Sequence, residues 1–250
     1  MSWLRTYQTA APGATTVVAL PHAGGAASFF APWRAALPAG WGLVAAKYPA
    51  REDRFAEPPA ASLAQLAASI ADELTQPASL AAITGPVILF GHSLGAIVAF
   101  ELAVARQAAG QQVALLAASA AGPTTSERLL TARVSQGPAG AAELARQIGA
   151  LDPESAAALQ NPELRDYALR IISGDLDLFQ RHTLSPTILE AVPLLAIGGQ
   201  DDPSTPVEEI GWWRQRTTGP FTELILPGGH FYLRQQLPAV MAALVRSATA

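Results

Sequence analysis

The segment GHSLG, residues 91–95, places Ser93 between two glycines that each stand two positions away. It follows a short apolar run, residues 87–90, and precedes a long apolar helical pattern. A serine on such a strand-to-helix turn has its hydroxyl lifted clear of the sheet, and the glycines leave room where side chains would collide. The pattern predicts Ser93 as the nucleophile of an acyl transfer that proceeds through a covalent acyl-enzyme. The structural alternative is a glycine-rich turn that only packs a helix onto a strand.

A serine nucleophile needs a general base, and the sequence contains four histidines. His92 lies inside the turn and points away from its neighbour Ser93, while His22 precedes a Gly-Gly pair near the first predicted strand. His182 falls in a helical region, where a surface position is the simpler interpretation. His230 follows the last predicted strand, at the carboxyl edge where open α/β sheets carry their sites. We therefore predict His230 as the base, against the alternative of a loop histidine without a catalytic role.

An imidazole base needs a carboxylate that fixes its tautomer and stabilises its charged form. The predicted strand 194–197 runs into GGQDDP, so Asp201 and Asp202 compete for this role. Asp202 is favoured because Pro203 directly follows it and can fix the turn, and Asp201 stays the alternative. The resulting order of serine, aspartate and histidine is the order of the α/β-hydrolase fold.

The oxyanion that develops during acyl transfer needs hydrogen-bond donors. These are usually the amide after the nucleophile and one amide from the loop after an early strand. Leu94 follows the nucleophile, and Ala23 lies in PHAGG, residues 21–25, directly after the predicted strand 17–20. We predict the backbone amides of Ala23 and Leu94 as the oxyanion hole. The alternative for PHAGG is an ordinary glycine-rich strand end.

Short apolar runs alternate with helical patterns along the chain, as in βαβ units around a mostly parallel sheet. The runs are apolar throughout, so we expect helices on both faces of the sheet. The predicted fold class is α/β, with the α/β-hydrolase arrangement. The predicted strands are 17–20, 42–47, 87–90, 113–118, 194–197 and 222–226, and the predicted helices are 62–74, 94–106, 139–148, 161–172 and 233–246.

Residues 122–186 interrupt this alternation, since they contain helical patterns but no convincing strand. We interpret them as a helical insertion in a single domain that spans residues 1–250. Long excursions of this kind are often functional, so a lid over the site is favoured over structural padding.

The composition excludes several classes of function. A net charge of -4 offers no basic surface, so neither nucleic acid nor a membrane is an expected partner. The chain has no cysteine, which excludes a thiol nucleophile, disulfides and cysteine-bound metals. The first ten residues lack the apolar stretch of a signal peptide, so we expect a cytoplasmic protein. We also expect a monomer without a metal or a cofactor.

Several segments together resemble a type II thioesterase, a stand-alone α/β-hydrolase associated with polyketide and nonribosomal peptide synthetases. The resemblance spans nearly the whole chain and is most specific in PHAGG and PGGHFY, because generic hydrolases share only GHSLG. The family often has glycine where this chain has Ala50, a departure that concerns the local loop and not the chemistry. The segments are LPHAGG (20–25), YPAR (48–51), GHSLG (91–95), DP (202–203) and LPGGHFY (226–232).

The resemblance implies a function and assigns the site. It implies that acyl groups are hydrolysed from the phosphopantetheine arm of an acyl or peptidyl carrier domain, with water as acceptor. In the family this reaction clears stalled or aberrant acyl units from a synthase. The triad would be Ser93, Asp202 and His230, the oxyanion donors Ala23 and Leu94, and the lid residues 122–186.

Three points stay open after the sequence is read. Arg51 and Arg54 could serve carrier docking or structural ion pairs, and we favour ion pairs. The same triad would serve a carboxylester hydrolase that acts on free small-molecule esters. A catalytically inactive hydrolase fold used as a binding module is the third possibility, although every catalytic role has a competent residue in the right order.

Overall fold

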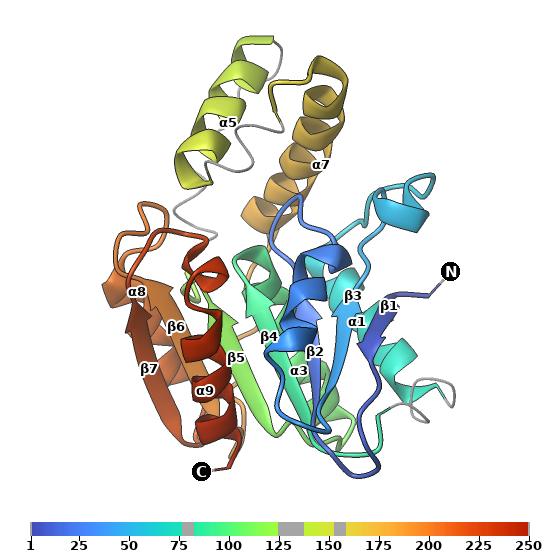
Figure 1. The fold of residues 1–250 in the computed structure, drawn as a ribbon, viewed down its shortest axis with the longest axis vertical. Helices are drawn as coiled ribbons and strands as arrows, with labels where there is room; N and C mark the ends of the chain where they lie inside the picture. The colour runs from blue at the N-terminus through green and yellow to red at the C-terminus, as the bar shows by residue number, and fades with distance from the viewer. Residues whose placement is uncertain (1, 77–82, 125–137, 153–158, 250) are drawn as a thin grey trace.

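Seven strands in the described part of the chain form one sheet (Figure 1). The structure is a computed structural model that describes residues 2–76, 83–124, 138–152 and 159–249. The sheet order is β1-β3-β2-β4-β5-β6-β7, and β1 alone runs antiparallel to its neighbour. The carboxyl ends of the six parallel strands therefore meet along one edge. The strands are β1 (Leu4–Gln8), β2 (Thr16–Leu20), β3 (Gly42–Ala46), β4 (Val87–His92), β5 (Leu115–Ser119), β6 (Leu194–Gly199) and β7 (Phe221–Leu226).

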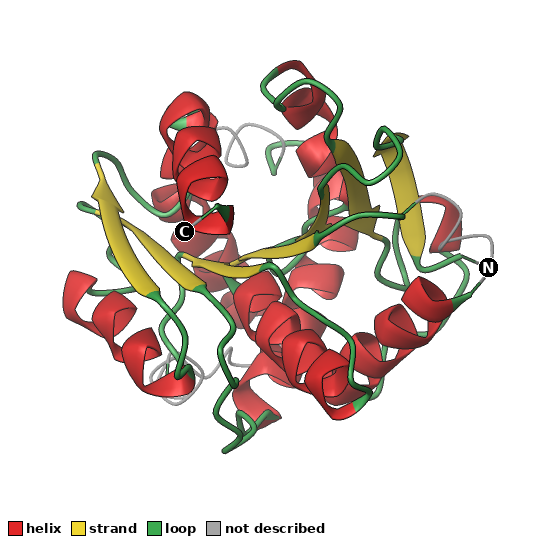
Figure 2. Ribbon diagram, turned by 90° about the horizontal axis from the view of Figure 1, so that it is seen from below, coloured by secondary structure: helices red, strands yellow, loops and turns green. Residues whose placement is uncertain are grey.

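The central strands are buried on both faces, because alternate side chains enter two separate cores. Val18 and Leu20 of β2 belong to one core, and Val17 and Ala19 belong to the other. Figure 2 shows helices on both sides of the sheet, which confirms the predicted layers. Helices α1 (Leu63–Thr75) and α3 (Leu94–Ala108) cover the first core, and the 3-10 helix η1 (Ala27–Ala35) with α9 (Leu237–Ala248) covers the second.

Two helices of the described residues lie between β5 and β6 in the chain, within the segment predicted as an insertion. Helices α5 (Pro138–Leu151) and α7 (Pro162–Arg181) stand above the carboxyl edge of the sheet (Figure 1). Leu144, Leu159 and Leu169 form a small core between them. The side chain of Asn161 caps the start of α7, where it accepts hydrogen bonds from two amides of the first turn.

The structure corrects several predicted boundaries. Helix α7 runs to Arg181 rather than residue 172, because a polar stretch there hides the helical pattern. The last helix begins at Leu237 rather than residue 233, since a 3-10 turn, η4 (Tyr232–Arg234), precedes it. β1 was not predicted, because a half-exposed edge strand of mixed polarity gives no clear pattern. The sequence also did not predict η2 (Glu52–Arg54), α8 (Val207–Gly211) or η3 (Trp212–Arg216).

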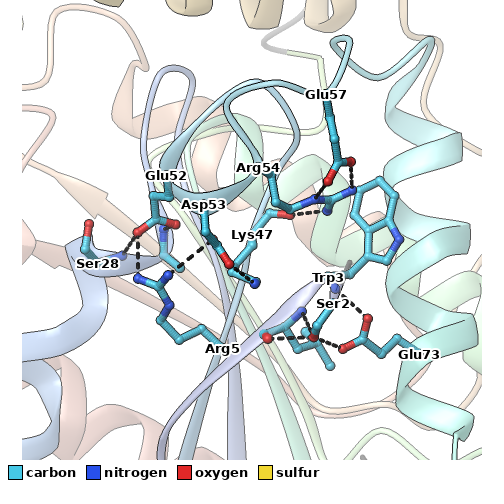
Figure 3. A network of polar contacts seen from close by, with 12 residues as sticks. Ser2, Trp3, Arg5, Ser28, Lys47, Glu52, Asp53, Arg54, Glu57 and Glu73 are labelled. Atoms are coloured by element: carbon cyan, nitrogen blue, oxygen red, sulfur yellow. Dashed lines mark hydrogen bonds and ion pairs between the residues drawn. The ribbon is translucent and has the colours of Figure 1, made fainter.

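Ion pairs tie the loop after β3 to β1 and β3 (Figure 3). Arg5 of β1 pairs with Glu52 at 3.1 Å and with Asp53 at 3.2 Å, and Lys47 pairs with Asp53 at 2.7 Å. The Glu52 carboxylate also accepts hydrogen bonds from two amides at the start of η1. Ala50 has a φ of 66°, so the left-handed conformation that favours glycine is present here with an alanine.

Among the described residues, no helix combines the length and apolarity that a membrane crossing requires.

Candidate active site

Ser93 stands on a strained turn between β4 and α3. Its φ of 56° and ψ of -123° lie outside the regions that a serine ordinarily adopts. A Cβ on Gly91 would lie 2.0 Å from the carbonyl oxygen of Gly95, and a Cβ on Gly95 would lie 2.1 Å from the carbonyl oxygen of Leu20. Both glycines are therefore required by close backbone approach, as a nucleophile elbow demands.

A buried hydrogen-bond chain supports this turn from below. The Ser93 amide donates to the carbonyl oxygen of Ser119 at 2.7 Å. The Ser119 hydroxyl lies 2.9 Å from His92 Nδ1 and 2.6 Å from the Tyr232 hydroxyl. Ser119 and His92 are completely buried, so this pair supports the site and offers no nucleophile to a substrate.

His230 is held by a carboxylate and a hydroxyl on the loop after β6. Its Nδ1 lies 2.7 Å from Asp202 Oδ2 and 2.9 Å from Ser204 Oγ. Ser204 donates its hydroxyl hydrogen to Asp202 Oδ1 at 2.6 Å, and its amide donates to the same oxygen at 2.8 Å. Because Asp202 and Ser204 both act as acceptors toward Nδ1, the proton lies on Nδ1 and Nε2 keeps its lone pair.

The two aspartates that compete in the sequence have different surroundings. Asp202 is 8% exposed and contacts His230, whereas Asp201 is exposed and its amide donates to the carbonyl oxygen of Gly228. Sequence reasoning missed Ser204, which the Asp-Pro-Ser spacing could have indicated, since an aspartate often accepts a hydrogen bond from the amide two residues later. This geometry favours Asp202 as the partner of the imidazole.

Burial and hydrogen bonding shift the pKa values around the site. Burial alone would raise the pKa of Asp202, but hydrogen bonds from His230 and Ser204 outweigh it and lower that pKa. Burial, together with nearby positive charge, lowers the pKa of His22 to about 3, and burial holds the pKa of His92 well below its ordinary value. His22 and His92, two of the three histidines rejected as bases, are therefore neutral side chains at neutral pH.

Ser93 and His230 line one cavity of about 270 Å³, which Ala23 also lines. Within the described residues the Ser93 hydroxyl makes no hydrogen bond to the imidazole, although both reach the same space. Hydrogen bonds of this kind are often long before a substrate is bound. The two side chains are thus brought together at one cavity, but their direct contact stays a prediction.

Of the two predicted oxyanion donors, Ala23 lines this cavity and Leu94 directly follows Ser93. Leu94 is the first residue of α3, where backbone amides have no acceptor within the helix. Ala23 lies in the turn after β2, and among the described residues no acceptor engages its amide. A helix N-terminus adds a favourable field for a developing negative charge.

Much of the remaining lining is apolar and comes from α5 and α7. Helix α5 contributes Leu144, Ile148 and Leu151, and α7 contributes Ile172 and Leu176. This lining suits an aliphatic group bound beside the serine hydroxyl. Within the described ranges, no three carboxylate or imidazole groups lie close enough together to hold a metal ion.

A buried and a part-buried Arg–Asp pair join α7 and the end of α5 to segments next to the site. Arg51 forms two hydrogen bonds of 2.7 Å with Asp175 of α7. Arg234 forms hydrogen bonds of 2.7 and 2.9 Å with Asp152, the residue after α5. Arg54 pairs instead with Glu57, three residues away, and both Arg51 and Arg54 are buried.

His182 lies away from this cavity and is less exposed than predicted. Its Nε2 lies 2.8 Å from Glu101 Oε1, and its side chain is 10% exposed. It therefore ties the end of α7 to α3 and is not a free surface histidine.

A family model described as a thioesterase domain matches residues 15–247. The chain belongs to the thioesterase family. This thioesterase is 36% identical over 249 residues to a probable cadicidin biosynthesis thioesterase of Streptomyces griseus, a match that covers 98% of this chain and 65% of that protein. It is 33% identical to thioesterase PikA5 of Streptomyces venezuelae, over 94% of this chain and 81% of that protein.

Solved structures of thioesterases share the fold. The type II thioesterase BorB from the borrelidin biosynthetic cluster superposes with a TM-score of 0.80 at 35% identity, covering 98% of this chain and 97% of its own. YbtT, a type II thioesterase of the yersiniabactin NRPS/PKS pathway, superposes with a TM-score of 0.81 at 27% identity, covering 99% and 98%. The predicted α/β-hydrolase fold and the resemblance to type II thioesterases are confirmed.

Proposed function

We propose that this protein is a type II editing thioesterase. It hydrolyses acyl groups from the phosphopantetheine arm of acyl or peptidyl carrier domains and so removes stalled or aberrant units from a polyketide or nonribosomal peptide synthetase. The proposal is carried by one observation above all: in a chain of the thioesterase family, one cavity is lined by Ser93 on its strained elbow and by His230, whose imidazole pairs with Asp202. The pathways named for BorB and YbtT support the choice of pathway.

The geometry supports a two-step reaction. Ser93 Oγ attacks the thioester carbonyl carbon while His230 Nε2 takes the hydroxyl proton, and the amides of Ala23 and Leu94 stabilise the oxyanion. The C–S bond then breaks, and the thiol leaves with that proton. Water next attacks the acyl-enzyme as His230 takes its proton, and release of the carboxylic acid returns the proton to Ser93. A thiol has a pKa of about 8.5, so its departure needs little acid assistance.

Electrostatics favour this sequence of proton transfers. The lowered pKa keeps Asp202 ionised, and its hydrogen bond fixes the imidazole tautomer that leaves Nε2 free. The same carboxylate stabilises the imidazolium that forms when His230 takes the serine proton.

We further propose that residues 1–250 form a single domain in which residues 122–186 are the lid, although residues 125–137 and 153–158 of this segment lie outside the described part of the chain. The apolar side chains of α5 and α7 would hold the acyl chain and exclude water from the thioester. The protein would act as a cytoplasmic monomer beside its synthase.

The test compares an acyl-carrier thioester with a matched carrier-free oxygen ester. We expect hydrolysis of the thioester by the wild type and a loss of about 10⁴-fold or more in Ser93→Ala, as in other triads. A fluorophosphonate should label the wild type but not Ser93→Ala. The control Ser119→Ala should keep the label, because Ser119 is completely buried. A strong preference for the oxygen ester would indicate a carboxylester hydrolase, and an unlabelled wild type would indicate a binding module.

A further inference from the structure

A buried carboxylate of the lid touches the turn that carries one oxyanion donor. Asp175 of α7 is 6% exposed, and its Oδ2 accepts a 2.7 Å hydrogen bond from the Gly24 amide. The same oxygen accepts a 2.7 Å hydrogen bond from Arg51 Nη1, while Oδ1 accepts one from Arg51 Nη2. Arg51 is 5% exposed. A carboxylate, a guanidinium and a backbone amide are therefore hydrogen-bonded to one another in a buried position. Removal of one group leaves a buried partner without its hydrogen bond.

The turn is held on both of its sides. Arg51 Nη1 also donates to the carbonyl oxygen of Gly25 at 3.0 Å, so the peptide groups before and after Gly24–Gly25 have fixed partners. Gly24 has a φ of 75°, and a Cβ there would lie 2.2 Å from Ile172 Cγ1 of α7. The lid helix thus packs directly on the backbone of this turn. Ala23, whose amide is the predicted donor, is the residue before Gly24.

Arg51 lies on a loop that is anchored to the sheet. It lies on the loop that the ion pairs of Figure 3 tie to the sheet, and its Nε donates to the carbonyl oxygen of Pro49 at 3.2 Å. The neighbouring Glu52 pairs with Arg5 of β1. Asp175 belongs instead to α7, so the two sides of the contact come from different parts of the chain.

We propose that Asp175 is a positioning residue for the oxyanion hole. By holding the Ala23–Gly24 peptide group and anchoring to Arg51, it sets the direction of the Ala23 amide while α7 lies on the turn. The inference rests on the proposed function and deepens it: a lid residue that does not touch the substrate completes the catalytic geometry. Loss of this contact should weaken stabilisation of the transition state rather than binding of the acyl chain.

The first test separates kcat from KM. We expect Asp175→Ala to lower kcat about 10²-fold, the effect of misplacing one oxyanion donor, with KM changed less than about threefold. Asp175→Asn keeps an oxygen that can accept from the Gly24 amide, so it should recover part of that loss. The matched control is Asp177→Ala on the same helix, where the exposed carboxylate pairs with Arg181 four residues on, and its kcat should equal that of the wild type.

The second test distinguishes positioning from stability. The double variant Arg51→Met/Asp175→Leu replaces the buried ion pair with apolar side chains of similar size, which proteins often tolerate. Its melting temperature should approach that of the wild type. The double variant therefore tests the proposal even if Asp175→Ala does not fold. Its kcat should stay low, because the Gly24 amide still lacks its acceptor. Recovery of both values, or a wild-type kcat in Asp175→Ala, would overturn the proposal.

A third measurement keeps this inference separate from the proposed function. The rate of labelling by a fluorophosphonate reads the serine and the oxyanion hole without any thioester substrate. If the wild type is labelled but hydrolyses no carrier thioester, the proposed function fails, while slow labelling of Asp175→Ala would still support the positioning role. Equal labelling rates for the wild type and Asp175→Ala would contradict the positioning role of Asp175.

Discussion

At the scale of single residues, one hydroxyl distinguishes the two candidate acids. Ser204 donates two hydrogen bonds to Asp202 and lies against His230, so the carboxylate and the imidazole share a third partner. Such a partner fixes both the rotamer of the acid and the tautomer of the base. Asp201 has no comparable neighbour and faces solvent.

Replacement of these side chains should reproduce that difference. We expect Asp202→Asn to lower kcat by about 10⁴-fold, because an amide can stabilise the wrong imidazole tautomer. Asp201→Asn should change kcat less than about twofold. Ser204→Ala should lower it by about tenfold, the equivalent of one hydrogen bond to a charged group. Steady-state hydrolysis of one acyl-carrier thioester measures all three, and a larger loss in Asp201→Asn would reassign the acid.

At the scale of elements, close backbone approach decides where the serine stands. Strand β4, the turn and α3 are so near β2 that a Cβ on Gly95 would overlap the Leu20 carbonyl oxygen. Helix α7 and the end of α5 meet the loops of the site in a different way, through the buried pair of Asp175 with Arg51 and the part-buried pair of Asp152 with Arg234. Close backbone contact fixes the elbow, whereas ion pairs contribute to the placement of these two helices.

Two glycine-to-alanine substitutions test this description. Gly95→Ala should destabilise the protein by roughly 2–3 kcal/mol or more, since the opposing atom is backbone and cannot move aside. Gly174→Ala in α7 is the matched control, because nothing lies within 4 Å of the added Cβ. It should stabilise the protein by about 0.5–1 kcal/mol through the higher helix propensity of alanine. Urea unfolding measures both, and equal effects would contradict the crowded elbow.

At the scale of the whole molecule, folding keeps two histidines from taking up protons. The pKa of His22 falls from 6.5 to about 3, and that of His92 is well below 6.5, in each case mainly through burial. Below pH 6.5 the unfolded chain therefore binds more protons than the native one. Stability contributed by these residues is complete above that pH and declines as the pH falls toward about 3.

Acid should accordingly weaken the fold well before the carboxylates titrate. Between about pH 7.5 and about pH 5.5 we expect a loss of up to about 1.4 kcal/mol for each of the two histidines. Urea unfolding at the two pH values measures the loss. In His92→Asn, whose amide can still reach Ser119, the pH-dependent loss should be about half as large. An unchanged pH dependence in that variant would exclude His92 as a source.

The sequence by itself determined the features that depend on local pattern. Apolar runs predicted the six parallel strands, and glycine spacing predicted the elbow at Ser93. Both signals are local, because hydrophobic periodicity and backbone sterics involve residues that are close in the sequence. The same local patterns did not predict β1 or the C-terminal part of α7, because polar residues on exposed faces obscure the hydrophobic periodicity there.

Only the tertiary structure decided which distant groups meet. It placed Asp202 rather than Asp201 against His230, and it brought Asp175 to Arg51 across 124 positions of the chain. Such pairs depend on how a helix or loop packs over a sheet edge, and no local spacing in the sequence records that packing. The proposed triad was therefore predictable in outline, whereas the contact between α7 and the turn at Gly24 required the folded molecule.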